Sequence, residues 1–187
     1  MALELEPILR DTTLTPADKT TIFRGIVQVA QADGEMDPRE REYLQQVVGE
    51  FFPGENFSAL LAGYRALEDA DLKALSTDAA RDCFTAFLFM TAYADEEFSD
   101  DEKTLLEKLT AGVLPAARVD ELRAGVRQYL YRRAVFHFVL NQNFLHPEFA
   151  REMARRFEVP EDIAVALNTE VYQAVLVLHG APQSAEG

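Results

Sequence analysis

The stretch QADGEMDPRE, residues 31–40, has the composition of a junction between two helices. Gly34 is typical of the left-handed residue that closes a helix. Asp37, Pro38 and Glu40 match a helix start, with an aspartate cap, a proline in the first turn and a glutamate at the third position. Apolar residues recur at helical spacing on both sides of the stretch. The stretch therefore predicts a helical hairpin.

The same arrangement returns further along the chain as YADEEFSDDE, residues 93–102. When residue 33 is set against residue 95, the acidic residues and the flanking apolar positions of the two stretches fall in register. Such a repeat predicts two related helical hairpins, over about 18–52 and 78–112. We expect a pseudo-two-fold axis to relate them and to bring the two acidic junctions together.

Helical spacing of apolar residues continues through almost the whole chain of 187 residues. No segment shows the sustained two-residue alternation that marks half-buried strands. With 48% apolar content the chain is long enough to bury a core. We therefore expect an all-α fold, a compact bundle of about eight helices in a single domain over residues 1–187, with a helical extension over 115–180.

Charge and composition exclude several classes of protein. The formal net charge of −14 argues against binding to the phosphate backbone of nucleic acids. The N-terminus MALELEPILR is acidic where a secretory signal is basic, and the longest apolar stretch, residues 84–94, is too short to span a bilayer. Cys83 is the only cysteine, so no intrachain disulfide or thiolate zinc cluster forms. We expect a cytoplasmic protein with no transmembrane segment and no nucleic-acid partner.

The junction acids form a candidate site for a divalent cation. Asp33 and Asp95 lie near helix C-termini, where the helix dipole disfavours an anion by up to about 1 kcal/mol. Positive charge is expected to offset that term, and oxygen ligands at short spacing favour calcium or magnesium over zinc. The candidate ligands are Asp33, Glu35, Asp37, Glu40, Asp95, Glu97, Asp100 and Glu102.

An EF-hand does not account for this pattern. Residues 33, 35 and 37 match the first, third and fifth positions of such a loop, but the twelfth position is Leu44, and Leu106 in the second copy. The sixth position is not glycine in either copy. A site assembled from carboxylates of both junctions remains the metal hypothesis.

Two other interpretations of the acids stay open. The arginine-rich segment after Pro115 offers guanidinium groups that bind carboxylates through two hydrogen bonds, which would make the repeat an electrostatic seam without a ligand. Plain solvent exposure is the other interpretation. The stretch over 129–149 places aromatic residues beside arginines, which is typical of a surface for a partner or an anionic membrane, and also of a helix packed in its own core.

The two junctions, AQADGEMDPRE and AYADEEFSDDE, resemble the TerB-like family, the tellurite-resistance module whose relatives include the N-terminal segment of a membrane-anchored DnaJ co-chaperone. The shared pattern is A-x-A-D-G-x-x-x-x-x-E, and the resemblance covers roughly residues 18–112. The second copy departs from it at Glu96, where the family usually has glycine.

The resemblance implies a compact helical module of bacterial stress responses that binds metal through its junction acids and acts with other proteins, often near membranes. It implies Asp33, Glu40, Asp95 and Glu102 as matched acids, with the remaining four in auxiliary roles. No catalytic reaction follows from it, and the chain has neither a glycine-rich phosphate loop nor a nucleophile elbow. We expect a protein that is not an enzyme. The alternative is a metal-free adaptor whose acids pair with its own arginines or with a basic partner.

Overall fold

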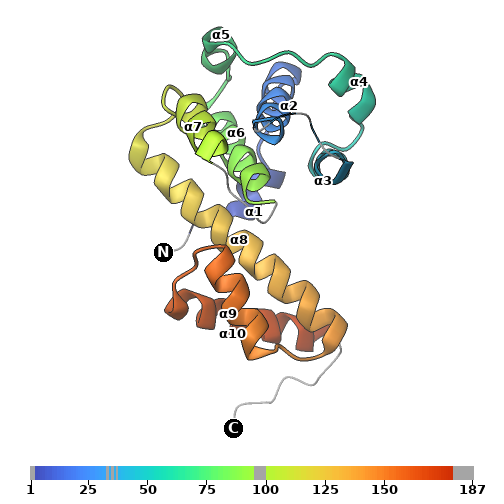
Figure 1. Ribbon diagram of the computed structural model, residues 1–187, viewed down its shortest axis with the longest axis vertical. Helices are drawn as coiled ribbons and strands as arrows, with labels where there is room; N and C mark the ends of the chain where they lie inside the picture. Colours follow the sequence, from blue (N-terminus) through green and yellow to red (C-terminus); the bar gives the residue numbers. More distant parts are fainter. Residues whose placement is uncertain (1–2, 33, 35, 37, 95–99, 179–187) are drawn as a thin grey trace. The chain divides into compact units, whose positions relative to one another are not determined.

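The fold consists of helices joined by short connections (Figure 1). The structure is a computed structural model that describes residues 3–32, 34, 36, 38–94 and 100–178. These residues form ten helices and no strand, which confirms the expected all-α class. The helices are α1 (Leu5–Arg10), α2 (Pro16–Ala30), α3 (Pro38–Phe51), α4 (Phe57–Ala62), α5 (Asp69–Lys73), α6 (Asp78–Ala92), α7 (Asp100–Thr110), α8 (Ala116–Gln142), α9 (Pro147–Arg156) and α10 (Glu161–Leu178).

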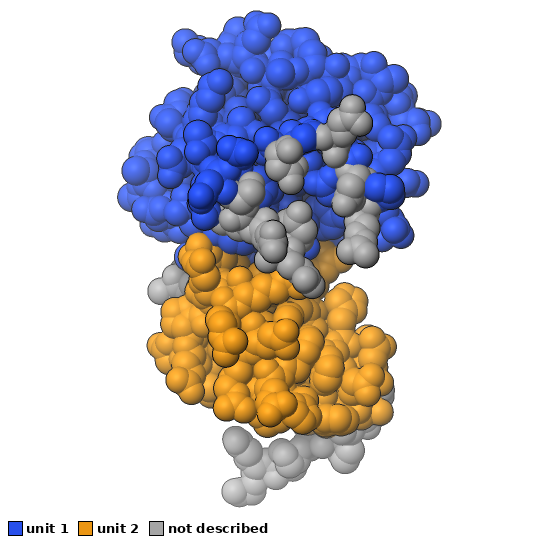
Figure 2. Space-filling model, in the orientation of Figure 1, with its two compact units in different colours: residues 1–126 blue, residues 127–187 orange. Residues whose placement is uncertain are grey.

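The chain divides into two compact units, residues 1–126 and residues 127–187 (Figure 2). Helices α1 to α7 and the first part of α8 belong to the first unit, and the rest of α8 belongs to the second with α9 and α10. The expected single domain over 1–187 stays a prediction. No helix in the described part of the chain combines the length and apolar character needed to cross a membrane.

Helices α2 and α6 form the core of the first unit and pack against each other. Each begins after a threonine cap: the hydroxyl of Thr15 accepts a hydrogen bond from the backbone N–H of Asp18, and the hydroxyl of Thr77 accepts one from Ala80. These bonds satisfy backbone donors that a helix start leaves unpaired. Burial of apolar surface between the two helices is the main stabilising term here. The fully buried side chains include Ile22, Ile26, Phe84, Phe87 and Leu88.

Helices α2 and α6 run in the same direction. In the first turn of α2, the carboxylate of Asp18 accepts hydrogen bonds from Ser76, which immediately precedes the cap of α6. Halfway along, Gly25 approaches the middle of α6 so closely that a Cβ at this position would lie 2.7 Å from Phe84 Cε2 and 2.8 Å from Leu88 Cδ2. The C-terminal ends of the two helices therefore lie on the same side of the pair.

The bounds of the helices keep the register of the sequence repeat, in which residue 33 is set against residue 95. Helix α2 spans 16–30 and α6 spans 78–92, so both their starts and their ends match in that register. Helix α3 begins at Pro38 and α7 at the equivalent position, Asp100. The C-caps also match: the N–H of Gln31 reaches the carbonyl oxygens of residues 27 and 29, and the N–H of Tyr93 reaches those of residues 89 and 91. The expected pseudo-two-fold axis itself stays a prediction.

The second unit has its own apolar core, built by α8, α9 and α10. His146 caps α9 and Pro147 begins it, as both residue types permit. After α9 the chain turns sharply at Glu158, whose φ of 49° lies in the left-handed region, and the carboxylate of Glu158 binds the guanidinium of Arg127 at 2.5 Å. The buried core side chains are Tyr131, Val135, Val139, Phe157, Val159, Ala164, Val171 and Val175.

Candidate functional site

The predicted cation ligands fall into two groups. Three of them, Glu40, Asp100 and Glu102, lie in the first turns of α3 and α7. The other five lie outside the described residues: Asp33, Glu35, Asp37, Asp95 and Glu97.

The three described ligands differ in burial. Glu40 is half-buried and Glu102 is only 8% exposed, and each occupies the third position of its helix. A carboxylate at this position and depth suits the local capping role that the sequence predicts. Asp100 is exposed, and its carboxylate accepts a hydrogen bond of 2.9 Å from Lys103. That bond and the ammonium charge lower the pKa of Asp100. Asp100 therefore lies at the protein surface, unlike its neighbour Glu102.

One hydrogen bond joins the two hairpins close to the junctions. The hydroxyl of Tyr43, in α3, donates to the backbone carbonyl of Met90 at 3.0 Å. Met90 lies in the last turn of α6, just before the second junction, and α3 is the helix that follows the first junction. The elements that flank the two junctions are thus in direct contact.

In the described part of the chain, no three histidine, cysteine, aspartate or glutamate side chains gather closely enough to hold a metal ion. Five of the eight predicted ligands lie beyond that search. The metal hypothesis stays a prediction.

Two arginines of the arginine-rich segment, Arg118 and Arg123, contact residues outside the junctions. Arg118 binds Asp82 at 2.6 Å and Glu121 at 2.7 Å, and these hydrogen bonds raise the pKa of its guanidinium. Arg123 lies 5.1 Å above the ring of Phe89, a cation–π arrangement. None of these partners is a junction acid. The described contacts of Arg118 and Arg123 therefore do not depend on the eight predicted ligands.

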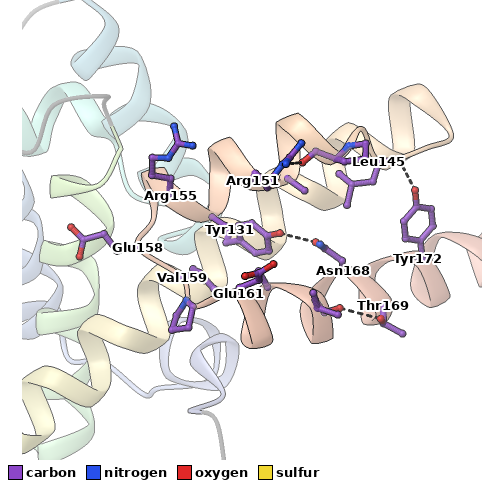
Figure 3. A pocket seen from close by; sticks show the side chains of 16 residues that line it. Tyr131, Leu145, Arg151, Arg155, Glu158, Val159, Glu161, Asn168, Thr169 and Tyr172 are labelled. Carbon is purple, nitrogen blue, oxygen red and sulfur yellow. Dashed lines mark hydrogen bonds between the residues drawn. The ribbon is translucent and has the colours of Figure 1, made fainter.

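A groove of about 1080 Å³ opens in the second unit, and the sequence did not predict it (Figure 3). Helices α9 and α10 form its walls, and Tyr131 of α8 lies at its floor. The hydroxyl of Tyr131 donates to Asn168 Oδ1 at 2.8 Å, and the backbone N–H of Leu145 donates to the hydroxyl of Tyr172. These bonds fix the polar groups of a lining that is mostly apolar.

Exposed apolar side chains also gather in the second unit. In the described residues, every large apolar side chain that is strongly exposed lies between residues 140 and 178. Within 129–149, Tyr129 and Val139 are buried, whereas Leu140 and Phe144 are 37% and 51% exposed; a surface for a partner or a membrane here stays a prediction. The others are Val165, Leu176, Val177 and Leu178.

Comparison with known proteins finds no relative. The chain matches no protein-family model, no curated protein and no solved structure. The resemblance to the TerB-like family therefore stays a prediction, and function has to be argued from the geometry.

Small residues on one helix face are the sequence signal that could have indicated the groove. Ala150 and Ala154 lie four residues apart on α9, and Ala164 of α10 lines the same groove. Side chains four apart share one face of a helix, and alanines leave that face hollow. Alanine is also the best helix former, so by itself the pattern indicates only a helix.

Proposed function

We propose that this protein is a non-catalytic bacterial stress-response module, similar to the TerB-like family, in which the two acidic junctions bind one divalent cation. Calcium or magnesium is favoured over zinc because the candidate ligands are carboxylates. The observation that supports the proposal is the common direction of α2 and α6, whose bounds match in the register of the repeat. Both junctions follow helices that end on the same side.

The two helix C-termini and the carboxylates that follow them are expected to attract positive charge. Each helix C-terminus carries roughly half a negative charge from aligned peptide dipoles. Two such ends on one side, each followed by a run of carboxylates, raise the free energy of the folded state unless a cation balances them. A bound divalent ion would hold the two hairpins together at the end where Tyr43 contacts the carbonyl of Met90. In this mechanism, ion binding fixes the two hairpins relative to each other and so changes the position of a helix that faces a partner protein.

Calorimetric titration tests the proposal. Metal-stripped protein is titrated with calcium, magnesium and zinc chlorides, alongside the double variant Asp33→Asn/Asp95→Asn. Asp11→Asn/Asp162→Asn is the matched control, because it makes the same charge change at two exposed residues outside the two junction sequences. We expect saturable binding in wild type and control and its loss in the junction variant. At a free ion concentration of 100 times Kd, linkage adds about 2.7 kcal/mol to the free energy of unfolding.

A metal-free adaptor is the second candidate, supported by the charge of the first unit. Residues 1–126 contain 25 acidic and 12 basic side chains. Such a surface suits a basic partner. This candidate predicts that no ion binds and that Asp33→Asn/Asp95→Asn melts at or above the wild-type temperature, because the substitution relieves repulsion between carboxylates. The same titration and melts therefore separate the two candidates.

A further inference from the structure

We propose that the groove between α9 and α10 is a docking site for an acidic amphipathic helix of a partner protein. This inference goes beyond the cation hypothesis, because the groove lies in the second unit and uses none of the junction acids. Its occupant is identified by the shape, the charge and the polar groups of the groove.

The shape of the groove suits a row of apolar side chains. Its floor is recessed, since Tyr131 is 0% and Ala164 5% exposed, whereas Val165 at the rim is 60% exposed. A recessed apolar channel between two helices is the usual receptor for the apolar face of an amphipathic helix. A bilayer surface is flat on this scale and does not reach such a floor.

The α9 wall of the groove is basic and favours an acidic partner face. Two acidic residues, Glu158 and Glu161, line the groove where α9 turns into α10, and the carboxylate of Glu158 is paired with Arg127. Arg151 and Arg155 line the α9 wall, four residues apart, and both are exposed. Figure 3 shows both side chains on the same wall. Among the described residues neither of them forms an ion pair. Carboxylates three or four residues apart on a partner helix have a matching spacing and would bind the two guanidinium groups.

The opposite wall adds a polar contact. The side-chain oxygen of Asn168 is occupied by the hydroxyl of Tyr131. Within the described residues its amide nitrogen forms no hydrogen bond, so it remains a donor in the lining of the groove. A carboxylate or a backbone carbonyl of the partner would accept from it. Arg151, Arg155 and Asn168 thus offer donors to the acidic face of a partner helix. Glu161, in contrast, disfavours carboxylates of the partner beside the α9–α10 turn.

The test begins with a displayed library of helical peptides selected on the immobilised full-length chain. We expect the enriched peptides to be amphipathic and to carry acidic residues three or four apart. A selected peptide is then synthesised with a fluorescent label, and its Kd is measured by anisotropy against wild type and variants. The peptide with its acidic residues replaced by glutamine should bind at least about tenfold more weakly.

Two matched pairs of variants locate the binding site. Val165→Glu and Val177→Glu change the same residue type on α10 at 60% and 61% exposure, but only Val165 lines the groove. Arg155→Glu and Arg156→Glu make the same charge change at adjacent positions of α9, and only Arg155 lines the groove. We expect the first member of each pair to weaken peptide binding about tenfold or more, and the second less than about twofold. Thermal melts confirm that each variant folds.

Three outcomes would overturn the proposal. The first is that no peptide is enriched, and the second is enrichment without acidic residues. The third is equal loss of binding within a matched pair. Flotation with vesicles containing an anionic phospholipid covers the lipid alternative: binding to vesicles that Arg155→Glu abolishes, without any peptide binding, would assign the surface to a membrane. The peptide-binding results do not depend on whether calcium or magnesium binds to the junctions. The cation proposal and the docking proposal can therefore fail independently.

Discussion

Replacing Asp18 with asparagine should destabilise the protein at pH 7, and by less at pH 3. Asp18 is 1% exposed, and its carboxylate accepts four hydrogen bonds of 2.7 to 2.9 Å, two from Thr15 and two from Ser76. Burial by itself would raise the pKa of Asp18. The hydrogen bonds from Ser76 and Thr15 outweigh burial and lower that pKa from 3.8 to about 2.

The lowered pKa gives the size and the pH dependence of the stability that ionised Asp18 contributes. Since the folded-state pKa lies below the unfolded one, ionised Asp18 contributes stability that is complete above about pH 4 and is lost as the pH falls towards 2. The shift corresponds to about 2 kcal/mol, of which about half remains at pH 3. Asparagine removes the charge and turns an N–H₂ group towards N–H and O–H donors. We expect a loss of about 2–3 kcal/mol at pH 7.

Urea unfolding followed by circular dichroism measures this loss at both pH values. In a chain of this length a loss of about 2–3 kcal/mol lowers Tm by roughly 5–10 °C. Asp101→Asn is the control, since Asp101 is an exposed aspartate in the first turn of α7. If Asp18→Asn unfolds like wild type at pH 7, or if its deficit is the same at pH 3, the reasoning about the carboxylate is wrong.

Two further predictions concern the packing of α2 against α6. Gly25→Ala should destabilise by about 1–3 kcal/mol, because its Cβ would overlap with Phe84 and Leu88, whereas Gly49→Ala on α3, with nothing within 4 Å, should be neutral or stabilising in thermal melts. Cys83 is 0% exposed and burial raises its thiol pKa to about 12, so a disulfide reagent should react with it only after unfolding in urea. Rapid reaction of the native protein at pH 8 would contradict this prediction.

Local sequence signals predicted the start of α3, which begins at Pro38 as a proline in the first turn indicates. Thr15 and Thr77 cap helices because their hydroxyls compete for nearby N–H groups, an effect that depends on only a few residues. Helix α4 ends at Ala62, before a glycine. Helix α1 was not expected, because six residues are too short to show periodicity. Buried Leu5 and Leu9 account for its stability, and their partners are distant in sequence.

The candidate sites depend on information that local patterns lack. The repeat predicted that two acidic junctions exist, and its register returns in the bounds of α2 and α6. That the two helices run in the same direction follows from contacts such as Asp18 with Ser76, which are 58 residues apart. The groove requires three helices to be placed together. A pattern of alanines cannot reveal which hollow faces meet and which are filled by a neighbouring side chain.

The positive charges of the second unit have a consequence for chemical labelling. Residues 127–187 contain six arginines and no lysine, and all four lysines of the chain lie between residues 19 and 108. Lysine acetylation, and amine reagents that modify lysine side chains, therefore act on lysines of the first unit and leave the guanidinium groups along the groove unchanged. A fluorophore attached through a lysine would report on the protein without altering the charge of the α9 wall.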